Sequence, residues 1–181
     1  MQYREATAAD AETIARLHAD SWRRNYRGAF SDAFLDGDVL EDRLTVWADR
    51  LASADSGRRT IVADHDGTVV GFAHSVFDDH PTWGALLDNL HVAHAVKRAG
   101  IGRRLLGHTA AAVLDRTPST GLYLWVLEQN TPAQAFYDAL GGTSVERGLS
   151  HPPGGGSAAR LRYVWPDPSV VLTRQRAADS R

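Results

Sequence analysis

The sequence contains no cysteine and no long apolar run. The absence of cysteine excludes thiol catalysis, thiolate metal ligation and a disulfide framework. The N-terminus, Met1–Glu5, carries charge at once, and no later run approaches the length that spans a membrane. Because nothing in the sequence reads as a signal peptide, we expect a cytoplasmic protein with no membrane partner.

The chain also has little net charge. Its 20 Lys and Arg residues face 22 Asp and Glu residues, which gives a net charge of −2. This balance offers no electrostatic reason to expect nucleic acid as a partner. The histidines show no metal-ligand spacing, so we predict no metal site. With 181 residues, 43% of them apolar, the chain is long enough to bury one core.

Helical and extended patterns are mixed along the chain. Helical apolar spacing runs from Ile14 to Trp22 and again from Leu40 to Leu51, with a break predicted over 22–34 between the two helices. Asp66-Gly67 predicts a hairpin turn. Strands are predicted at 2–6, 60–63, 68–76, 85–92, 121–127, 143–149 and 158–165, and further helices begin after Gly100 and at Thr131. The order β-α-α-β-β-β-α-β-α-β-β predicts an α/β or α+β three-layer fold.

The predicted domain covers residues 1–165. Residues 166–181 are polar and show no periodicity, which predicts a flexible C-terminal tail.

One segment between a predicted strand and a predicted helix is rich in small and basic residues. It reads Leu90-His91-Val92-Ala93-His94-Ala95-Val96-Lys97-Arg98-Ala99-Gly100-Ile101-Gly102-Arg103-Arg104-Leu105-Leu106. Free N–H groups at a helix start, together with the helix dipole, bind anions such as pyrophosphate. A tight structural turn is the alternative for the two glycines. The segment is not a Walker A loop, because Arg103-Arg104 follows Gly102 where Lys followed by Ser or Thr is required. It is not a dinucleotide-binding fingerprint, because Leu105 stands where a third small residue is required.

The run Lys97-Arg98-Ala99-Gly100-Ile101-Gly102, after the strand end Leu90-His91-Val92, resembles the acyl-CoA motif of the GNAT superfamily of N-acyltransferases. The resemblance implies that backbone groups at Leu90 and Val92 pair with the pantetheine arm of acetyl-CoA. It also implies that N–H groups from Arg98 to Arg103 hold the pyrophosphate. The implied cofactor-binding residues are Leu90, His91, Val92, Lys97, Arg98, Ala99, Gly100, Ile101, Gly102 and Arg103. Lys97, His94 and Arg98 depart from the usual residues, but the contacts involve mainly the backbone.

A second segment resembles the other cofactor segment of the same family. It reads Leu124-Trp125-Val126-Leu127-Glu128-Gln129-Asn130-Thr131-Pro132-Ala133-Gln134-Ala135-Phe136-Tyr137-Asp138-Ala139-Leu140-Gly141-Gly142. The resemblance implies that Asn130 hydrogen-bonds the cofactor arm and that Tyr137 is the general acid for the leaving thiolate. The structural alternatives are a helix cap for Asn130 and core packing for Tyr137.

The resemblance implies a GNAT-like mixed central sheet that splays open near 90–92 and is flanked by helices. It implies an N-acetyltransferase that moves an acetyl group from acetyl-CoA to a primary amine of a small molecule or peptide by direct attack on the thioester. A non-catalytic acyl-CoA-binding sensor or scaffold is the alternative. The sequence leaves the acceptor amine, the acyl length and a homodimer open.

Such a reaction needs a base for the amine, acting directly or through water. Strict strand alternation puts Asp88 on the same face as Leu90 and Val92, which makes Asp88 the first candidate. A hydrogen-bonded, catalytically idle Asp88 is the alternative, and His91 is the second candidate base.

The resemblance implies that the acceptor wall is formed by Trp22, Tyr26 and Phe34, with the loop at 154–156 as a lid. The basic run at 22–28 either contacts an anionic substrate or forms a solvated helix end.

Overall fold

The computed structural model describes residues 1–52, 55–117 and 120–180. Its strands are β1 (Gln2–Glu5), β2 (Arg58–His65), β3 (Thr68–His80), β4 (Gly84–Val92), β5 (Leu122–Leu127), β6 (Thr143–Ser150) and β7 (Ala158–Trp165). Its α-helices are α1 (Ala11–Asn25), α2 (Asp32–Asp36), α3 (Val39–Leu51), α4 (Ile101–Arg116), α5 (Thr131–Ala139) and α6 (Ser169–Asp179), with short 3-10 helices at Ala8–Asp10 and His94–Val96.

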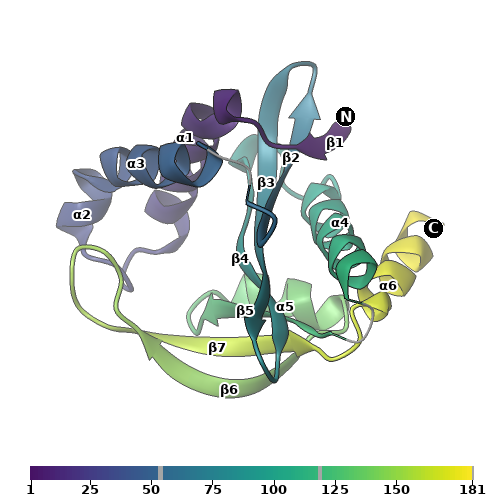
Figure 1. Cartoon of the computed structure of the whole chain (residues 1–181). Helices are drawn as coiled ribbons and strands as arrows, with labels where there is room; N and C mark the ends of the chain where they lie inside the picture. The colour runs from purple at the N-terminus through teal and green to yellow at the C-terminus, as the bar shows by residue number, and fades with distance from the viewer. Residues whose placement is uncertain (53–54, 118–119, 181) are drawn as a thin grey trace.

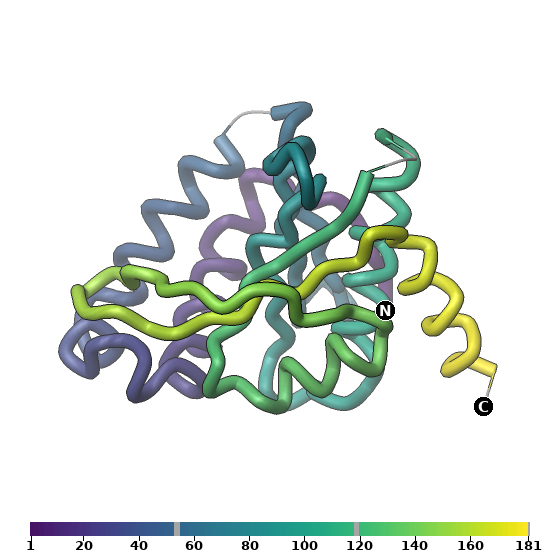
Figure 2. Tube along the Cα trace, turned by 90° about the horizontal axis from the view of Figure 1, so that it is seen from below, coloured from purple at the N-terminus to yellow at the C-terminus, as the bar shows by residue number. Residues whose placement is uncertain are grey.

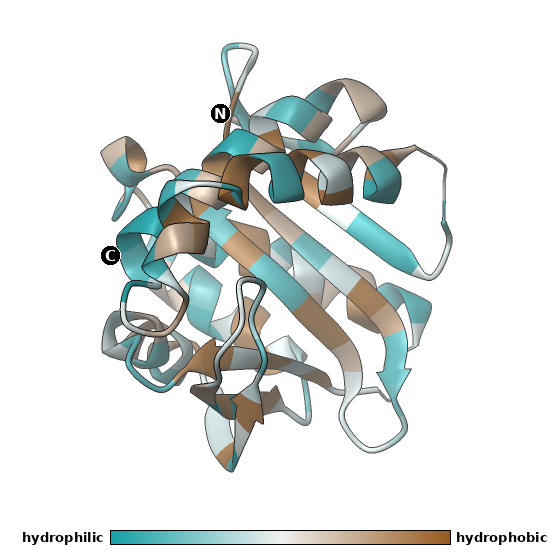
Figure 3. Cartoon of the chain, turned by 90° about the vertical axis from the view of Figure 1, so that its left-hand side faces the viewer, coloured by the Kyte–Doolittle hydropathy of each residue, from teal (hydrophilic) through white to brown (hydrophobic). Residues whose placement is uncertain are grey.

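The strands form one mixed sheet in the order β1-β2-β3-β4-β5-β7-β6. Every neighbouring pair is antiparallel except β4 and β5. Helices α1 and α3 cover one face, while α4, α5 and α6 lie on the other (Figure 1). Seen from the α1–α3 side, apolar and polar residues alternate along the strands (Figure 3). The three-layer mixed fold expected from the sequence is therefore confirmed.

The sheet opens between β4 and β5. Within the described residues, these two strands pair only at Ala85 with Leu122 and at Leu86 with Tyr123. Beyond that point β5 pairs with β7 along its whole length, whereas β4 continues alone on this side. The β4 backbone from residue 87 onward therefore presents an edge without a strand partner, which is the predicted splay.

A β-bulge in β4 changes which side chains share a face. His74 of β3 pairs with Asn89 and Ser75 pairs with Leu87, so Asp88 is an extra residue between them. Leu87 packs in the core beneath α4, whereas Asp88 and Asn89 both contact α3. The prediction that Asp88 shares a face with Leu90 and Val92 was wrong, because a bulge interrupts the two-residue repeat.

The helices differ from the sequence prediction in two places. Helix α1 runs past Trp22 to Asn25, and the short α2 follows it. A helix, α6, stands where a tail was expected, although Arg181 lies outside the described residues. Val171 of α6 is fully buried in the core beside α4, which gives this polar segment an anchor. No helix in the described ranges is long and apolar enough to cross a membrane.

The β6–β7 hairpin extends across the underside of the molecule toward α2 and α3 (Figures 1 and 2). A Cβ built on Gly154, in the loop of this hairpin, would lie 2.5 Å from Cβ of Phe34 in α2. The loop and α2 are therefore in direct contact. Through this contact the β6–β7 hairpin meets the helical layer to which α1, α2 and α3 belong.

Candidate active site

The loop between β4 and α4 has the backbone geometry of an anion site. Arg98 and Gly100 both adopt left-handed conformations, with φ of 68° and 78°. Gly100 is the N-cap of α4, and the first helical hydrogen bond runs from the Arg104 N–H to the Gly100 carbonyl at 3.1 Å. The N–H groups of residues 101–103 therefore point out of the helix end without helical acceptors. Left-handed turns beside a helix N-terminus form concave N–H clusters that bind phosphates.

The side chains of this loop contribute little to the concavity. Lys97, Arg98 and Ala99 are exposed, and Ile101 is buried in the core. The guanidinium of Arg103 donates to Asp179 of α6 at 2.7 Å. The loop therefore offers mainly backbone groups, as the resemblance implies.

Gly102 faces the gap between β4 and α5 rather than solvent. A Cβ placed on Gly102 would lie 3.6 Å from Phe136 and 3.7 Å from Val92. Val92 ends the free edge of β4, and Phe136 lies on the helix that follows β5. The small residue at 102 thus keeps space where the anion loop meets the opening of the sheet.

Helix α5 forms the other wall of the gap and carries Asn130 and Tyr137. The Asn130 Oδ1 accepts a hydrogen bond from the Ala133 N–H at 3.3 Å, so Asn130 caps the helix and its Nδ2 is left for another partner. The ring of Tyr137 packs beside Tyr163 and Trp165, at centroid distances of 5.8 and 5.9 Å. Both structural alternatives for these residues are therefore realised, and neither uses the polar atom that the resemblance assigns to the cofactor.

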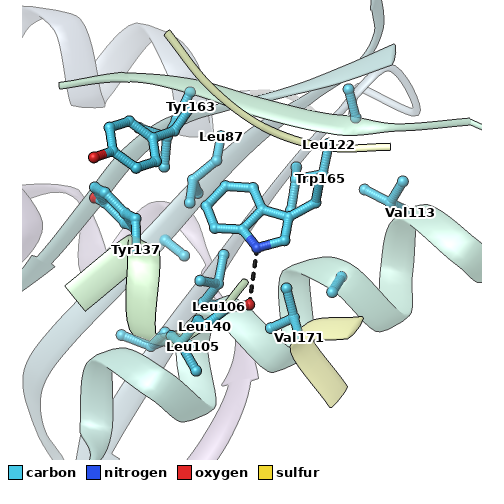
Figure 4. Close-up of a cluster of buried hydrophobic side chains, with 14 of the residues drawn as sticks. Leu87, Leu105, Leu106, Val113, Leu122, Tyr137, Leu140, Tyr163, Trp165 and Val171 are labelled. Carbon is cyan, nitrogen blue, oxygen red and sulfur yellow. Dashed lines mark hydrogen bonds between the residues drawn. The ribbon is translucent and has the colours of Figure 1, made fainter. Parts of the chain in front are cut away.

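The hydroxyl of Tyr137 lies at the edge of its cluster, away from the Trp165 indole (Figure 4). It makes no hydrogen bond within the part of the chain that the structure describes. Burial raises the pKa of Tyr137 above its ordinary value, and the neighbouring Tyr26 adds to the increase. Tyr137 is therefore a protonated phenol at neutral pH.

Asp88 is held by an arginine that the sequence did not connect to it. The Asp88 carboxylate lies 2.8 Å from Nη2 of Arg50 in α3, and Nη1 of Arg50 donates to Oδ1 of Asn89 at 2.9 Å. Burial, together with the negative charge of Asp88, raises the pKa of Tyr26 to about 12. The charge of Asp88 thus acts on Tyr26, and Tyr26 in turn acts on Tyr137. No local pattern signals Arg50, because only the fold places α3 beside the bulge.

His91 points away from the cofactor gap. Its Nδ1 lies 2.8 Å from Oγ of Ser21, and its ring centroid lies 4.5 Å from that of His18. Burial, with the charges of Lys97 and Arg43, lowers the pKa of His91 to about 3. Only the backbone of His91 can therefore face the cofactor side, and its imidazole is a weak base.

The predicted acceptor wall is partly structural core. Trp22 and Phe34 are 8% and 9% exposed, and they pack at the corner between α1 and α2. Tyr26 stacks on Trp22 at 5.6 Å, and burial together with the charge of Asp88 raises its pKa. Of the three predicted wall residues, Trp22 and Phe34 are therefore core residues, whereas Tyr26 is only partly buried.

The basic run at 22–28 is internally paired. Arg23 donates to the Leu35 carbonyl, Arg24 pairs with Asp20, and Arg27 pairs with Asp32 and Asp36. These pairs match a solvated helix end rather than a vacant anion site. The Gln129 side chain also donates to the Arg27 carbonyl at 2.8 Å, which ties the α1–α2 turn to the start of α5.

Among the described residues, no three His, Asp or Glu side chains gather in a way that could hold a metal ion.

Comparisons with known proteins agree with this geometry. The sequence profile of the Acetyltransferase (GNAT) family matches residues 13–141. An uncharacterized N-acetyltransferase, YuaI of Bacillus subtilis (strain 168), is 30% identical over 176 residues, which cover 94% of this chain and 95% of that protein.

Solved structures with the same fold include two with a bound cofactor. The paia N-acetyltransferase of Thermoplasma acidophilum in complex with coenzyme A has a TM-score of 0.67 at 20% identity and covers 91% of this chain and 98% of its own. A putative acetyltransferase of Salmonella typhimurium, yncA, with its cofactor acetyl-CoA, has a TM-score of 0.64 at 18% identity and covers 91% and 92%.

Proposed function

We propose that this chain, which belongs to the acetyltransferase (GNAT) family and is an acetyl-CoA-dependent N-acetyltransferase, acetylates a primary amine by direct attack of the amine on the thioester. The observation that carries the proposal is the separation of β4 from β5 after Leu86, next to the anion loop at Gly100. We place the acetyl transfer in that gap, between the phosphate site and the side chains of Asp88, Tyr26 and Tyr137. A non-catalytic sensor would need no unpaired phenol at this place.

The residues present fit acetyl-CoA. The N–H groups from Arg98 to Arg103 would hold the pyrophosphate, and the free backbone edge at Leu90 and Val92 would pair with the pantetheine arm. Asn130 would donate from Nδ2 to the same arm. The thioester supplies the activated acetyl group.

The proposed transfer moves two protons. The amine nitrogen forms a bond to the carbonyl carbon, the C–S bond breaks, and sulfur leaves with the electron pair. One proton leaves the nitrogen for Asp88, through water, because Arg50 already contacts the carboxylate. Tyr137 donates the other proton to sulfur, and water then returns the proton held by Asp88 to the Tyr137 oxygen. An ordinary thiol has a pKa of about 8.5, below that of a tyrosine, so the transfer to sulfur is complete only once the Tyr137 oxygen has been reprotonated.

Initial rates with both substrates varied test direct attack. We expect intersecting double-reciprocal lines, because the amine and acetyl-CoA must be bound together. We also expect the intact mass of the protein to stay unchanged after incubation with acetyl-CoA alone. Parallel lines together with a stably acetylated protein would exclude direct attack.

A further inference from the structure

Two arginines, Arg160 and Arg162, lie on β7, which pairs with β5 on the other side of the sheet opening from Asp88 of β4. In β5, Leu122, Leu124 and Val126 pack into the core, so Tyr123 and Trp125 occupy the other face. Arg162 of β7 is the register partner of Trp125, and Arg160 is the partner of Leu127. These side chains therefore share the face on which Asp88 meets Arg50.

Aromatic rings hold both guanidinium groups. Arg160 lies 4.1 Å and Arg162 4.6 Å from the ring centroid of Trp125, and Arg162 also lies 5.3 Å from that of Tyr123. Cation–π contacts of this kind restrict the guanidinium plane. The two positive charges are therefore fixed next to each other instead of moving apart into solvent.

Among the described residues, the two arginines have one direct carboxylate partner between them. Arg162 has one carboxylate neighbour, with its Nε 3.3 Å from Oε2 of Glu146, whereas Arg160 has no ion-pair partner among the described residues. The Nε atoms of both arginines are buried and make no hydrogen bond within those residues. The other carboxylate nearby, that of Asp79, accepts a hydrogen bond from the Tyr123 hydroxyl, so Arg160 is left without a direct counter-ion among the described residues. A buried donor without an acceptor is costly unless a ligand supplies the acceptor.

The surroundings of Arg160 disfavour its positive charge on balance, although Glu146 acts in the opposite direction. Burial lowers the pKa of Arg160 below its ordinary value, and the positive charge of Arg162 lowers it further. Arg147 of β6 differs from Arg160 in both respects, because it is exposed and forms a bidentate salt bridge with Glu128, at 2.7 and 2.8 Å.

We infer that Arg160, supported by Trp125 and Arg162, binds the carboxylate of the acceptor, so that the acceptor is an amino carboxylate. The inference rests on the proposed acetyl transfer and names its substrate class. A guanidinium fork matches a carboxylate in two parallel hydrogen bonds, and a monoanion would give Arg160 the direct counter-ion that it lacks. The contacts of the β6–β7 loop with Phe34 and of Gln129 with Arg27 restrict this end of the gap, which favours a small molecule over a protein chain.

Matched acceptors test the inference without any variant. The twenty L-amino acids and β-alanine are each compared with their carboxamides, and O-phosphoethanolamine represents an aminoalkyl phosphate. We expect at least one acid to exceed its amide by about 100-fold in kcat/KM, the scale of a charged hydrogen-bonded pair.

Variants then assign the preference to Arg160. Arg160→Gln is expected to remove the acid-over-amide preference by lowering kcat/KM for the acid about 100-fold while leaving the amide nearly unchanged. Arg160→Lys keeps the charge without the fork and is expected to restore part of the preference. Arg147→Gln, on the neighbouring strand, is the matched control and should leave the preference intact.

The outcomes separate this inference from the proposed function. Equal rates for acids and amides, or a preference for the phosphate, overturn the inference while acetyl transfer stands. If no amine is acetylated, the proposed function fails, and calorimetry of N-acetylated amino acids with the CoA-bound protein decides the inference. Binding that Arg160→Gln weakens supports it, whereas no binding, or binding that the substitution leaves unchanged, overturns it.

Discussion

At the scale of single residues, Gly100 and Tyr137 mark the two ends of the proposed acyl path. Gly100 bends the backbone at the anion loop, with φ of 78°. Tyr137 offers a hydroxyl on α5, at the edge of a largely apolar cluster, that has no hydrogen-bond partner among the described residues. For each of these residues the chain contains a residue of the same type in a similar local setting but outside the proposed site, namely Gly67 for Gly100 and Tyr163 for Tyr137.

Gly100→Ala should weaken CoA binding, whereas Gly67→Ala should not. Both glycines have left-handed backbones, with φ of 78° and 84°, and an added Cβ at either meets nothing closer than 3.4 Å. Each alanine is expected to lower the free energy of unfolding by about 1 kcal/mol, because a left-handed alanine is strained. Only at Gly100 would relaxation turn N–H groups away from the pyrophosphate. Urea unfolding and calorimetry with CoA measure the two effects, and equal CoA affinities in the two variants would contradict the assignment.

Tyr137→Phe is expected to lower kcat by about 10²-fold, the scale of one general acid. Packing and CoA affinity should change little, because the ring is kept and the anion loop lies elsewhere. Tyr163→Phe is the matched control, since Tyr163 is an equally buried neighbour whose ring lies 5.8 Å away. The readout is kcat at saturating acetyl-CoA for an acetylated amine. A Tyr137→Phe protein as active as the Tyr163→Phe protein would leave Tyr137 as a core residue only.

At the scale of elements, the strand positions followed from the sequence but the bulge did not. Alternation over 85–92 predicts β4 correctly, and it assigns Asp88 to the wrong face because the extra residue is defined only by the β3 partner. The same limit applies to Arg50, which reaches Asp88 from α3. Local patterns record which backbone state a segment adopts, whereas faces and charge partners depend on long-range register.

Helix α6 shows a related limit. Its polar sequence has no amphipathic repeat, and one fully buried side chain, Val171, fixes it to the core. The fit depends on α4 as well, since a Cβ on Gly107 would lie 1.8 Å from the Gln175 side chain. Close helix contact at a glycine leaves no signal in the sequence of α6 itself.

Val171→Asp is therefore expected to destabilise the protein by about 3 kcal/mol, because it removes a buried apolar group and places a charge in the core. Thr173→Asp, at an exposed position of the same helix, should change the free energy of unfolding by less than about 0.5 kcal/mol. Urea unfolding of both variants measures the difference. Equal stabilities would show that α6 does not depend on its contact with α4.

At the scale of the whole molecule, the face under α1 and α3 buries His18, His74 and His91. Burial is the main cause of the lowered pKa of each: about 4 for His74, about 3 for His91, and well below the ordinary value for His18. Each group is therefore neutral in the folded protein at pH values where the unfolded chain binds a proton. Their contribution to stability is complete above pH ~6.5 and is lost as the pH falls.

We expect the free energy of unfolding to fall steeply between about pH 6 and pH 4, by up to about 1.4 kcal/mol per pH unit for each histidine. Urea titrations at pH 7, 6 and 5 measure the slope. His91→Gln should reduce the slope by about one proton, and His65→Gln, at an exposed position, should leave it unchanged. A slope that is flat over this range, or that depends equally on His65, would contradict the burial of these three side chains as neutral groups.

The family was predictable because the segments 90–106 and 124–142 each carry a motif in which a strand end, a loop and a helix start follow in a fixed order. The acceptor was not predictable, since the proposed carboxylate site combines residues of β5 and β7 that become neighbours only in the folded sheet.

The most direct test of acetyl transfer follows the acetyl group itself. The protein is mixed with acetyl-CoA labelled in the acetyl carbonyl and with a panel of primary amines, and the products are identified by mass spectrometry while free thiol is counted. The account predicts one labelled N-acetyl amine for every CoA thiol released, and no label on the protein. Thiol release without an N-acetyl amine, or label retained on the protein, would contradict it.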